Sequence, residues 1–176
     1  MKRYIAFLRG INVSGQKLIK MDALKQHFDM PGFKNITTYI QSGNVLFDTQ
    51  ETDDTLLREK VEKQLLEKLG YEVPVIVRSL NDIKNVIANN PYGEPKTGDT
   101  RKLYITFLSG IPPGSLHSAL DAYKNEPEEL KIINREVYLL LASYGTTKLT
   151  NALIEKKLGV AATTRNWATV NKILEL

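Results

Sequence analysis

The sequence predicts an α+β protein made of two related ferredoxin-like units of the βαββαβ type, followed by an additional C-terminal helix. The main observation is an internal repeat. The octapeptide YIAFLRGI at residues 4–11 returns as YITFLSGI at residues 104–111, with six of eight positions identical. Similar predicted elements then follow both octapeptides in a similar order. Such a repeat indicates that one unit was duplicated, so features present in only one half are candidates for function.

The elements of the first unit follow from hydrophobic spacing and turn residues. Residues 4–8 are all apolar, which is typical of a strand buried on both faces. Ser42-Gly43-Asn44 between two β-rich segments predicts a hairpin. Apolar residues at every fourth position from Leu57 to Leu69, with Gly70 behind them, predict a helix and its C-terminal cap. The predicted elements are a strand over 4–8, a helix around 21–28, strands over 36–41 and 45–49, a helix over 53–69 and a strand over 73–78.

A helix that starts near Ser79 and stops before Pro91 follows the first unit. Residues 92–101 are rich in Gly, Pro, Lys and Thr, which indicates a linker. We therefore expect a first unit with its connecting helix at 1–90, a linker at 91–102 and a second, diverged unit at 103–176, packed as one body. The second unit is predicted to have a strand over 103–108, a helix over 115–123, strands over 131–134 and 137–142, a helix over 149–158 and, in place of a last strand, a final helix.

Composition is that of an ordinary globular protein: of 176 residues, 42% are hydrophobic and 25% are charged. The absence of cysteine excludes disulfides, thiolate metal sites and a cysteine nucleophile, and is typical of a reducing cytoplasm. No segment has the apolar length of a membrane span, so we expect a cytoplasmic protein with no membrane partner. The net charge of +4 is concentrated at the chain ends, and the first twenty residues carry five Lys or Arg and no acid. This pattern fits either a solvated surface or a site for an anionic partner.

The loop after the first strand is the first candidate site. Arg9, Asn12 and Lys17 have no counterparts in the second repeat, whereas Gly10 does. Glycines let backbone N–H groups approach an anion, and Arg and Lys supply the opposite charge. The spacing does not match a Walker loop. The loop is therefore either an anion-binding site or an ordinary connection.

The tip of the first predicted hairpin is the second candidate. A hairpin needs only Gly43 and Asn44 for its shape. Gln41 and Ser42 add further polar groups at the strand end, and the second half carries Asn-Arg-Glu at residues 134–136 instead. The polar residues are therefore either part of a site or part of the turn alone.

Residues 163–170 form the third candidate. A threonine at the start of this segment is expected to cap the final helix. Arg165 would then lie in the first helical turn, where the helix dipole disfavours a cation. Arg165, with Asn166 beside it, is expected either to pair with an acid or to bind an anion. Trp167 is expected in the core.

No combination of side chains indicates catalysis or metal binding. His27 and His117 both fall in predicted helices and are expected at the surface. The sequence contains no Ser-His-Asp order, nucleophile elbow or histidine pair with metal-binding spacing. It therefore indicates no catalytic residue, no metal and no particular cofactor.

Three segments carry a resemblance to a known family: LRGINV at residues 8–13, YIQSGNV at 39–45 and TTRNW at 163–167 followed by Thr169 and Val170. With these, the chain resembles the family known as domain of unknown function 1697 (DUF1697) over essentially its whole length. One departure is Ser14, where this family often has glycine. The resemblance implies a bacterial-type cytoplasmic α+β protein with duplicated ferredoxin-like segments. It implies no activity, substrate or cofactor.

The leading functional hypothesis is a site for a small anionic, phosphate- or nucleotide-like ligand to which all three motifs contribute. Arginine would hold the negative charge, and the amide side chains would orient the ligand. A nucleic-acid-binding module and a protein–protein adaptor stay open as alternatives. The pattern indicates neither an oligomeric state nor whether the protein is an enzyme. The candidate ligand-binding residues are Arg9, Asn12, Lys17, Gln41, Ser42, Asn44, Arg165 and Asn166.

Overall fold

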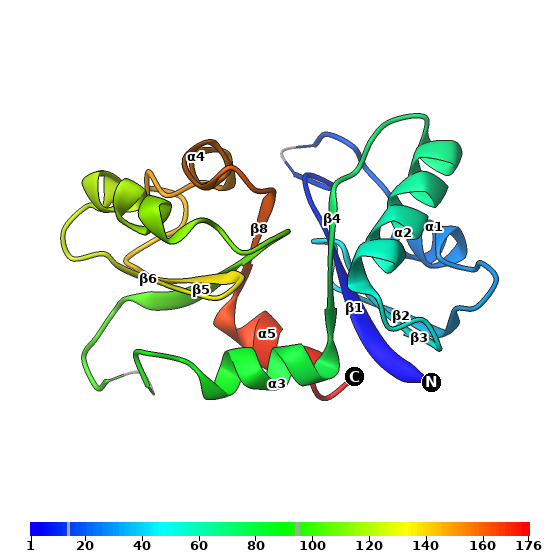
Figure 1. Cartoon of the computed structure of the whole chain (residues 1–176), viewed down its shortest axis with the longest axis horizontal. Coiled ribbons are helices and arrows are strands. Elements are labelled where there is room, and N and C mark those ends of the chain that lie inside the picture. Colours follow the sequence, from blue (N-terminus) through cyan, green and yellow to red (C-terminus); the bar gives the residue numbers. More distant parts are fainter. Residues whose placement is uncertain (14, 94–95) are drawn as a thin grey trace. The chain divides into compact units, whose positions relative to one another are not determined.

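The structure is a computed structural model that describes residues 1–13, 15–93 and 96–176 (Figure 1). Ser14 and two positions of the expected linker lie outside the described residues. The chain divides into two compact units: unit 1 comprises Met1–Lys84 and Ile173–Leu176, and unit 2 comprises Asn85–Lys172. Each unit contains one four-stranded antiparallel sheet.

Unit 1 packs helices α1 and α2 on one face of its sheet, whose strand order is β2-β3-β1-β4 (Figure 1). Alternate residues of the central strands point to this face, where the ring of Phe47 stacks on Phe33 with centroids 4.2 Å apart. Asp53 caps α2 and Gly70 ends it in the left-handed conformation, as the sequence indicates. The elements are β1 (Lys2–Leu8), α1 (Met21–His27), β2 (Lys34–Tyr39), β3 (Asn44–Thr49), α2 (Asp54–Leu69), β4 (Val75–Ser79) and the start of α3 (Leu80–Ala88).

Unit 2 repeats this arrangement with the strand order β6-β7-β5-β8. Helix α4 begins at the cap Thr150, ends at Gly159 and packs with the 3₁₀ helix η1 against one face of the sheet. The elements are β5 (Lys102–Leu108), η1 (Gly114–Tyr123), β6 (Glu129–Ile133), β7 (Glu136–Leu141), α4 (Asn151–Leu158), β8 (Ala162–Asn166) and α5 (Trp167–Ile173).

The two sheets agree in residue register as well as in strand order. In each, the central strand of the repeated octapeptide pairs with the second hairpin strand on one side and with the last strand on the other. The equivalent pairs are Phe7–Asn44 and Phe107–Glu136, and Leu8–Val75 and Leu108–Ala162. Duplication of one structural unit is therefore confirmed at the level of individual residues.

The repeat also includes the helix after the last strand. In unit 1 the Ser79 hydroxyl accepts a hydrogen bond from the Asp82 N–H at 3.1 Å, which caps α3. In unit 2 the Asn166 side chain accepts one from the Thr169 N–H at 2.8 Å, which caps α5. The C-terminal helix α5 is therefore the counterpart of α3, and the duplicated unit is βαββαβα.

The sequence prediction was wrong for residues 162–166, which form strand β8 and not the start of the final helix. All five residues pair with β5, whose partners lie about sixty positions earlier in the chain. A local helix-cap pattern cannot reveal pairing over that separation. The helix predicted over 115–123 is present at residues 114–123, as a 3₁₀ helix.

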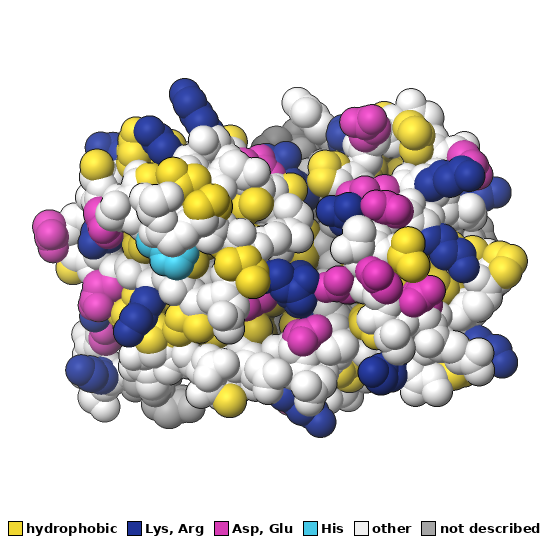
Figure 2. Space-filling view, in the orientation of Figure 1, with side chains coloured by type: hydrophobic (Ala, Val, Ile, Leu, Met, Phe, Trp, Pro, Cys, Tyr) yellow, Lys and Arg dark blue, Asp and Glu magenta, His cyan; other side chains and the backbone are white. Residues whose placement is uncertain are grey.

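The surface carries no simple charge pattern on the face shown in Figure 2, where Lys and Arg side chains are interspersed with Asp and Glu. A basic face or stripe is the usual mark of a nucleic-acid-binding domain. This face therefore offers no broad basic surface for a polyanion. Within the described ranges, no helix combines the length and apolar character that a membrane span needs.

Candidate functional site

The first two sequence motifs meet in unit 1. The Asn12 side-chain amide donates to the Gln41 carbonyl at 2.9 Å and to the Ile19 carbonyl at 3.0 Å, while its oxygen accepts from the Ile19 N–H at 2.8 Å. These three bonds tie the loop after β1 to itself and to the hairpin turn. Asn12 therefore holds the backbone together and keeps little hydrogen-bonding capacity for a ligand.

Gly43 brings the same two segments into close contact. Its φ is +75°, and a Cβ there would lie 2.8 Å from the Ile11 Cδ1 atom and 2.9 Å from the Leu8 Cβ atom. The Gly43 carbonyl also accepts a hydrogen bond from the Leu8 N–H at 2.8 Å. Only glycine meets both requirements, which explains this position of the hairpin motif without a ligand.

The other polar candidates of unit 1 divide into anchored and exposed side chains. Asn44 is buried and donates to the Tyr39 carbonyl and to the Ser42 hydroxyl, each at 3.0 Å. The exposed Lys17 donates to a backbone carbonyl at 3.2 Å and lies 4.9 Å from the centre of the Tyr71 ring. Gln41 is exposed and Arg9 is half-buried. The structure thus joins these residues at one end of the sheet, where Asn12 and Asn44 support the turn.

Arg165 of the third motif lies in unit 2, on a strand instead of in a helix. It is buried opposite Ile105, as Arg78 of unit 1 is buried opposite Ile5. The Arg165 Nη1 atom donates hydrogen bonds to the Thr163 hydroxyl and to the Thr164 carbonyl, both at 2.9 Å. Burial lowers the pKa of Arg165 to about 10, so the side chain is charged at neutral pH. Because both units have this arginine, it is a shared feature of the fold.

Asn166 and Trp167 lie where β8 passes into α5. Asn166 is exposed and caps the helix with its side-chain oxygen. Trp167 is half-buried and not in the core as expected. Both residues line a pocket that belongs to unit 2.

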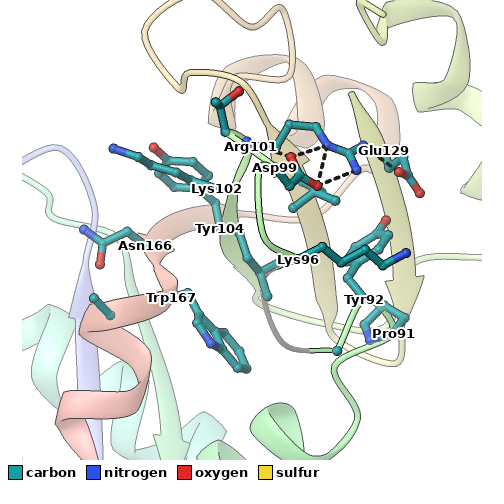
Figure 3. Close-up of a pocket in the computed structure, with 15 residues that line it drawn as sticks. Pro91, Tyr92, Lys96, Asp99, Arg101, Lys102, Tyr104, Glu129, Asn166 and Trp167 are labelled. Atoms are coloured by element: carbon teal, nitrogen blue, oxygen red, sulfur yellow. Dashed lines mark hydrogen bonds and ion pairs between the residues drawn. The ribbon is translucent and has the colours of Figure 1, made fainter. Parts of the chain in front are cut away.

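This pocket has a volume of about 740 Å³, which is within the range of small-molecule sites. Figure 3 shows Trp167 on one side of it, Pro91, Tyr92 and Lys96 on another, and a group of charged side chains above. The described residues that line it are Pro91, Tyr92, Gly93, Lys96, Asp99, Thr100, Arg101, Lys102, Leu103, Tyr104, Glu129, Leu140, Asn166, Trp167 and Ala168.

The sheet supplies an apolar wall. Leu103 and Leu140 are paired across β5 and β7, so they point to the same face. Lys102 and Tyr104 alternate with Leu103 and point to the opposite face, where Tyr104 packs against Tyr144 with ring centroids 5.3 Å apart. The side chains that define the pocket are therefore leucines, Trp167 and the residues that precede β5.

Arg101 organises the charged side. Its Nε and Nη2 atoms donate to the Asp99 carboxylate at 3.0 and 2.8 Å, and its Nη1 atom donates to the Glu129 carboxylate at 2.6 Å. The hydrogen bonds from Arg101 lower the pKa of Asp99 to about 2. Burial raises the pKa of Tyr92 to about 12, with the Glu129 carboxylate as a smaller cause. Tyr92 is therefore neutral at physiological pH, and Arg101 is balanced by two acids.

Lys96 and Lys102 line the pocket and make no ion pair within the described ranges, and the charge of Lys96 also helps to lower the pKa of Asp99. Lys102 points to the opposite face of the sheet, whereas the exposed Lys96 offers an ammonium group to an incoming anion. The pocket thus combines aromatic and aliphatic walls with the exposed Lys96 and an arginine held by carboxylates. Among the described residues, no group of three His, Cys, Asp or Glu side chains is placed to hold a metal.

Sequence reasoning missed this pocket, apart from Asn166. The segment at 91–102 has the composition of a linker, yet its described residues form one side of the pocket. One local signal was present: Asp99 and Arg101 are two positions apart, and an acid at this spacing can accept both the backbone and the guanidinium N–H groups, as it does here.

The fold and the register define a protein built from two copies of a ferredoxin-like unit, with a pocket in the second copy. The chain belongs to the DUF1697 family, described as proteins of unknown function, whose model matches residues 1–138. The structure is similar to that of the conserved bacterial protein SP0830 from Streptococcus pneumoniae, with a TM-score of 0.78, 22% identity and coverage of 100% of this chain and 99% of the other. That similarity shows the shared fold. No curated protein matches the sequence significantly.

Proposed function

We propose that unit 2 binds a small ligand with a planar ring and an anionic group, of the nucleotide type, in the pocket beside Trp167. The observation that carries the proposal is the half-buried indole of Trp167, which lines a pocket with an apolar wall of Leu103 and Leu140. Aromatic side chains in such positions stack on ligand rings and give about 1–3 kcal/mol per nucleobase.

The polar groups favour an anionic substituent on that ring. Lys96 provides an ammonium group on the pocket wall that no described acid pairs with. Arg101 is fixed by Asp99 through two guanidinium nitrogens and meets Glu129 only through Nη1. The Glu129 side chain is 52% exposed, so a phosphate can replace it at Nη1 without stranding a buried carboxylate.

The experiment uses Trp167 itself, because it is the single tryptophan of the chain. Its fluorescence should be titrated with a nucleoside, the matching nucleoside 5′-monophosphate and inorganic phosphate, with correction for absorbed light. Saturable quenching by both ring compounds is expected, tighter for the monophosphate, with none from phosphate alone. The absence of saturable quenching by any ring compound would reject the proposal.

Three variants separate the roles of the charged groups. Lys96→Gln should reduce the preference for the monophosphate over the nucleoside. Glu129→Gln should increase that preference, because Arg101 loses one of its two carboxylate partners. Lys131→Gln is the matched control, since Lys131 is exposed on β6 and does not line the pocket. Steeply salt-dependent binding of single-stranded RNA, with no response to mononucleotides, would instead favour a nucleic-acid-binding module.

A further inference from the structure

Three large hydrophobic side chains are exposed within two short segments of unit 1. Leu18 and Val13 lie in the loop at 9–20 and are 72% and 57% exposed, and Ile40 in the turn at 40–43 is 45% exposed. A single exposed aliphatic residue needs no explanation. These three lie on segments that the Asn12–Gln41 hydrogen bond holds together.

The backbone of these segments is strained where it presents the hydrophobic side chains. Ile40 has a φ of +49°, and Lys17, next to Leu18, has a φ of +47°. The left-handed conformation is an outlier for a β-branched residue, and such backbone strain persists only where the surrounding structure enforces it. The hydrogen bonds of Asn12 and the close contact of Gly43 hold the chain in this state.

Unit 2 shows that the fold does not need these features. Between β5 and η1 the connection is residues 109–113, against residues 9–20 between β1 and α1. The second hairpin pairs Ile133 with Glu136 and so turns in two residues, whereas the first pairs Tyr39 with Asn44 and turns in four. The longer loop and turn are therefore specific to unit 1.

The added segments are also positively charged. Arg9, Lys17 and Lys20 lie in the loop, and neither the loop nor the turn contains Asp or Glu. A surface with exposed apolar side chains and basic residues beside them complements a protein surface that combines apolar and acidic side chains. Single-stranded nucleic acid would call for aromatic stacking side chains, and the exposed tips here are aliphatic.

We propose that residues 9–13, 15–20 and 40–43, the unit 1 docking surface, bind a partner protein through an acidic segment that carries apolar side chains. This inference is independent of the pocket in unit 2. Leu18 and Ile40 would contact apolar side chains of the partner, and the exposed Lys17 and Lys20 would meet its carboxylates.

The test selects peptides from a random 12-residue display library against the full-length protein, with counter-selection against the double variant Leu18→Ser/Ile40→Gly. Glycine relieves the left-handed strain at residue 40, so this variant should fold, and thermal unfolding checks that it does. We expect enriched peptides to combine Asp or Glu with large apolar residues. Their affinity should fall at least about fivefold in Leu18→Ser and in Lys17→Gln.

Ile111→Ser is the matched control, because Ile111 is 69% exposed in the corresponding loop of unit 2. It should leave peptide affinity unchanged. The proposal is overturned if no peptide is enriched, if enriched peptides lack acids, or if Leu18→Ser has no effect. It is also overturned if the surface serves another partner. Leu18-dependent binding to vesicles of phosphatidylcholine and phosphatidylglycerol would show that the partner is a membrane. Loss of self-association in Leu18→Ser would show that the partner is a second copy of the chain.

Discussion

Glu62 and Glu155 occupy equivalent positions in the two units and make the same hydrogen bond. The Glu62 Oε1 atom accepts from the Val75 N–H at 2.8 Å, and the Glu155 Oε1 atom accepts from the Ala162 N–H at 2.9 Å. The bond joins α2 to the start of β4 in unit 1 and α4 to the start of β8 in unit 2. Val75 and Ala162 are equivalent, because they pair with Leu8 and Leu108 of the repeated octapeptides. The duplication has thus preserved a particular side-chain contact.

Removing either carboxylate should destabilise its unit by a similar amount. Glu62→Ala and Glu155→Ala should each lower the free energy of unfolding by about 1.5–3 kcal/mol, the usual contribution of a hydrogen bond to a charged group. Glutamine keeps an acceptor oxygen and should lose less. Urea denaturation measures both. Glu67→Ala, on the exposed side of α2, is the control and should stay within about 0.5 kcal/mol. A loss in only one unit would contradict the equivalence.

Two glycines with nearly the same backbone conformation should respond differently to alanine. Gly10 has a φ of +73° and no atom within 4 Å of the place that a Cβ would take, so Gly10→Ala should cost about 1–2 kcal/mol for the left-handed conformation alone. Gly43→Ala adds contacts under 3 Å with Ile11 and Leu8. Overpacking adds about 1–3 kcal/mol, so its total loss should exceed that of Gly10→Ala. Equal losses of unfolding free energy in urea denaturation would show that the turn at Gly43 can shift to accommodate the added methyl group.

Asn12 should matter for stability and not for a ligand. Asn12→Ala removes three hydrogen bonds to Ile19 and Gln41 and places alanine at a φ of +53°. We expect a loss of about 2–4 kcal/mol from unsatisfied backbone groups and left-handed strain. Gln41→Ala, which removes an exposed side chain but keeps the carbonyl, should change stability by less than about 0.5 kcal/mol. Similar unfolding midpoints for the two variants would restore Asn12 as a candidate ligand-binding residue.

Stability should depend on pH through Asp99. Hydrogen bonds from Arg101 lower the Asp99 pKa from 3.8 to about 2, so the folded state binds fewer protons than the unfolded state between these values. The stabilisation is present above about pH 4 and is lost as the pH falls toward about 2. Asp99→Asn should lower stability at neutral pH and flatten the pH dependence of the unfolding midpoint across that window. An unchanged slope there would contradict the assigned role of Arg101.

By itself, the sequence determined the features that depend on nearby residues. The repeated octapeptide predicted two equivalent units, and the periods of apolar residues predicted most of the strands and helices. Gly70 marked the end of α2, and Ser79 marked the start of α3. These signals are local because a cap or a turn is made by residues within one turn of the chain.

Only the tertiary structure decided which polar residues support the fold and which remain available. Arg165 was placed in a helix by its local sequence, but pairing with β5 made it a buried strand residue. Asn12 was predicted to bind a ligand, and in the structure its side chain donates to the carbonyl of the distant Gln41. The pocket beside Trp167 brings together residues far apart in sequence, including a segment with the composition of a linker. Composition and periodicity describe neighbours along the chain, whereas the charge balance and accessibility of a site depend on neighbours in space.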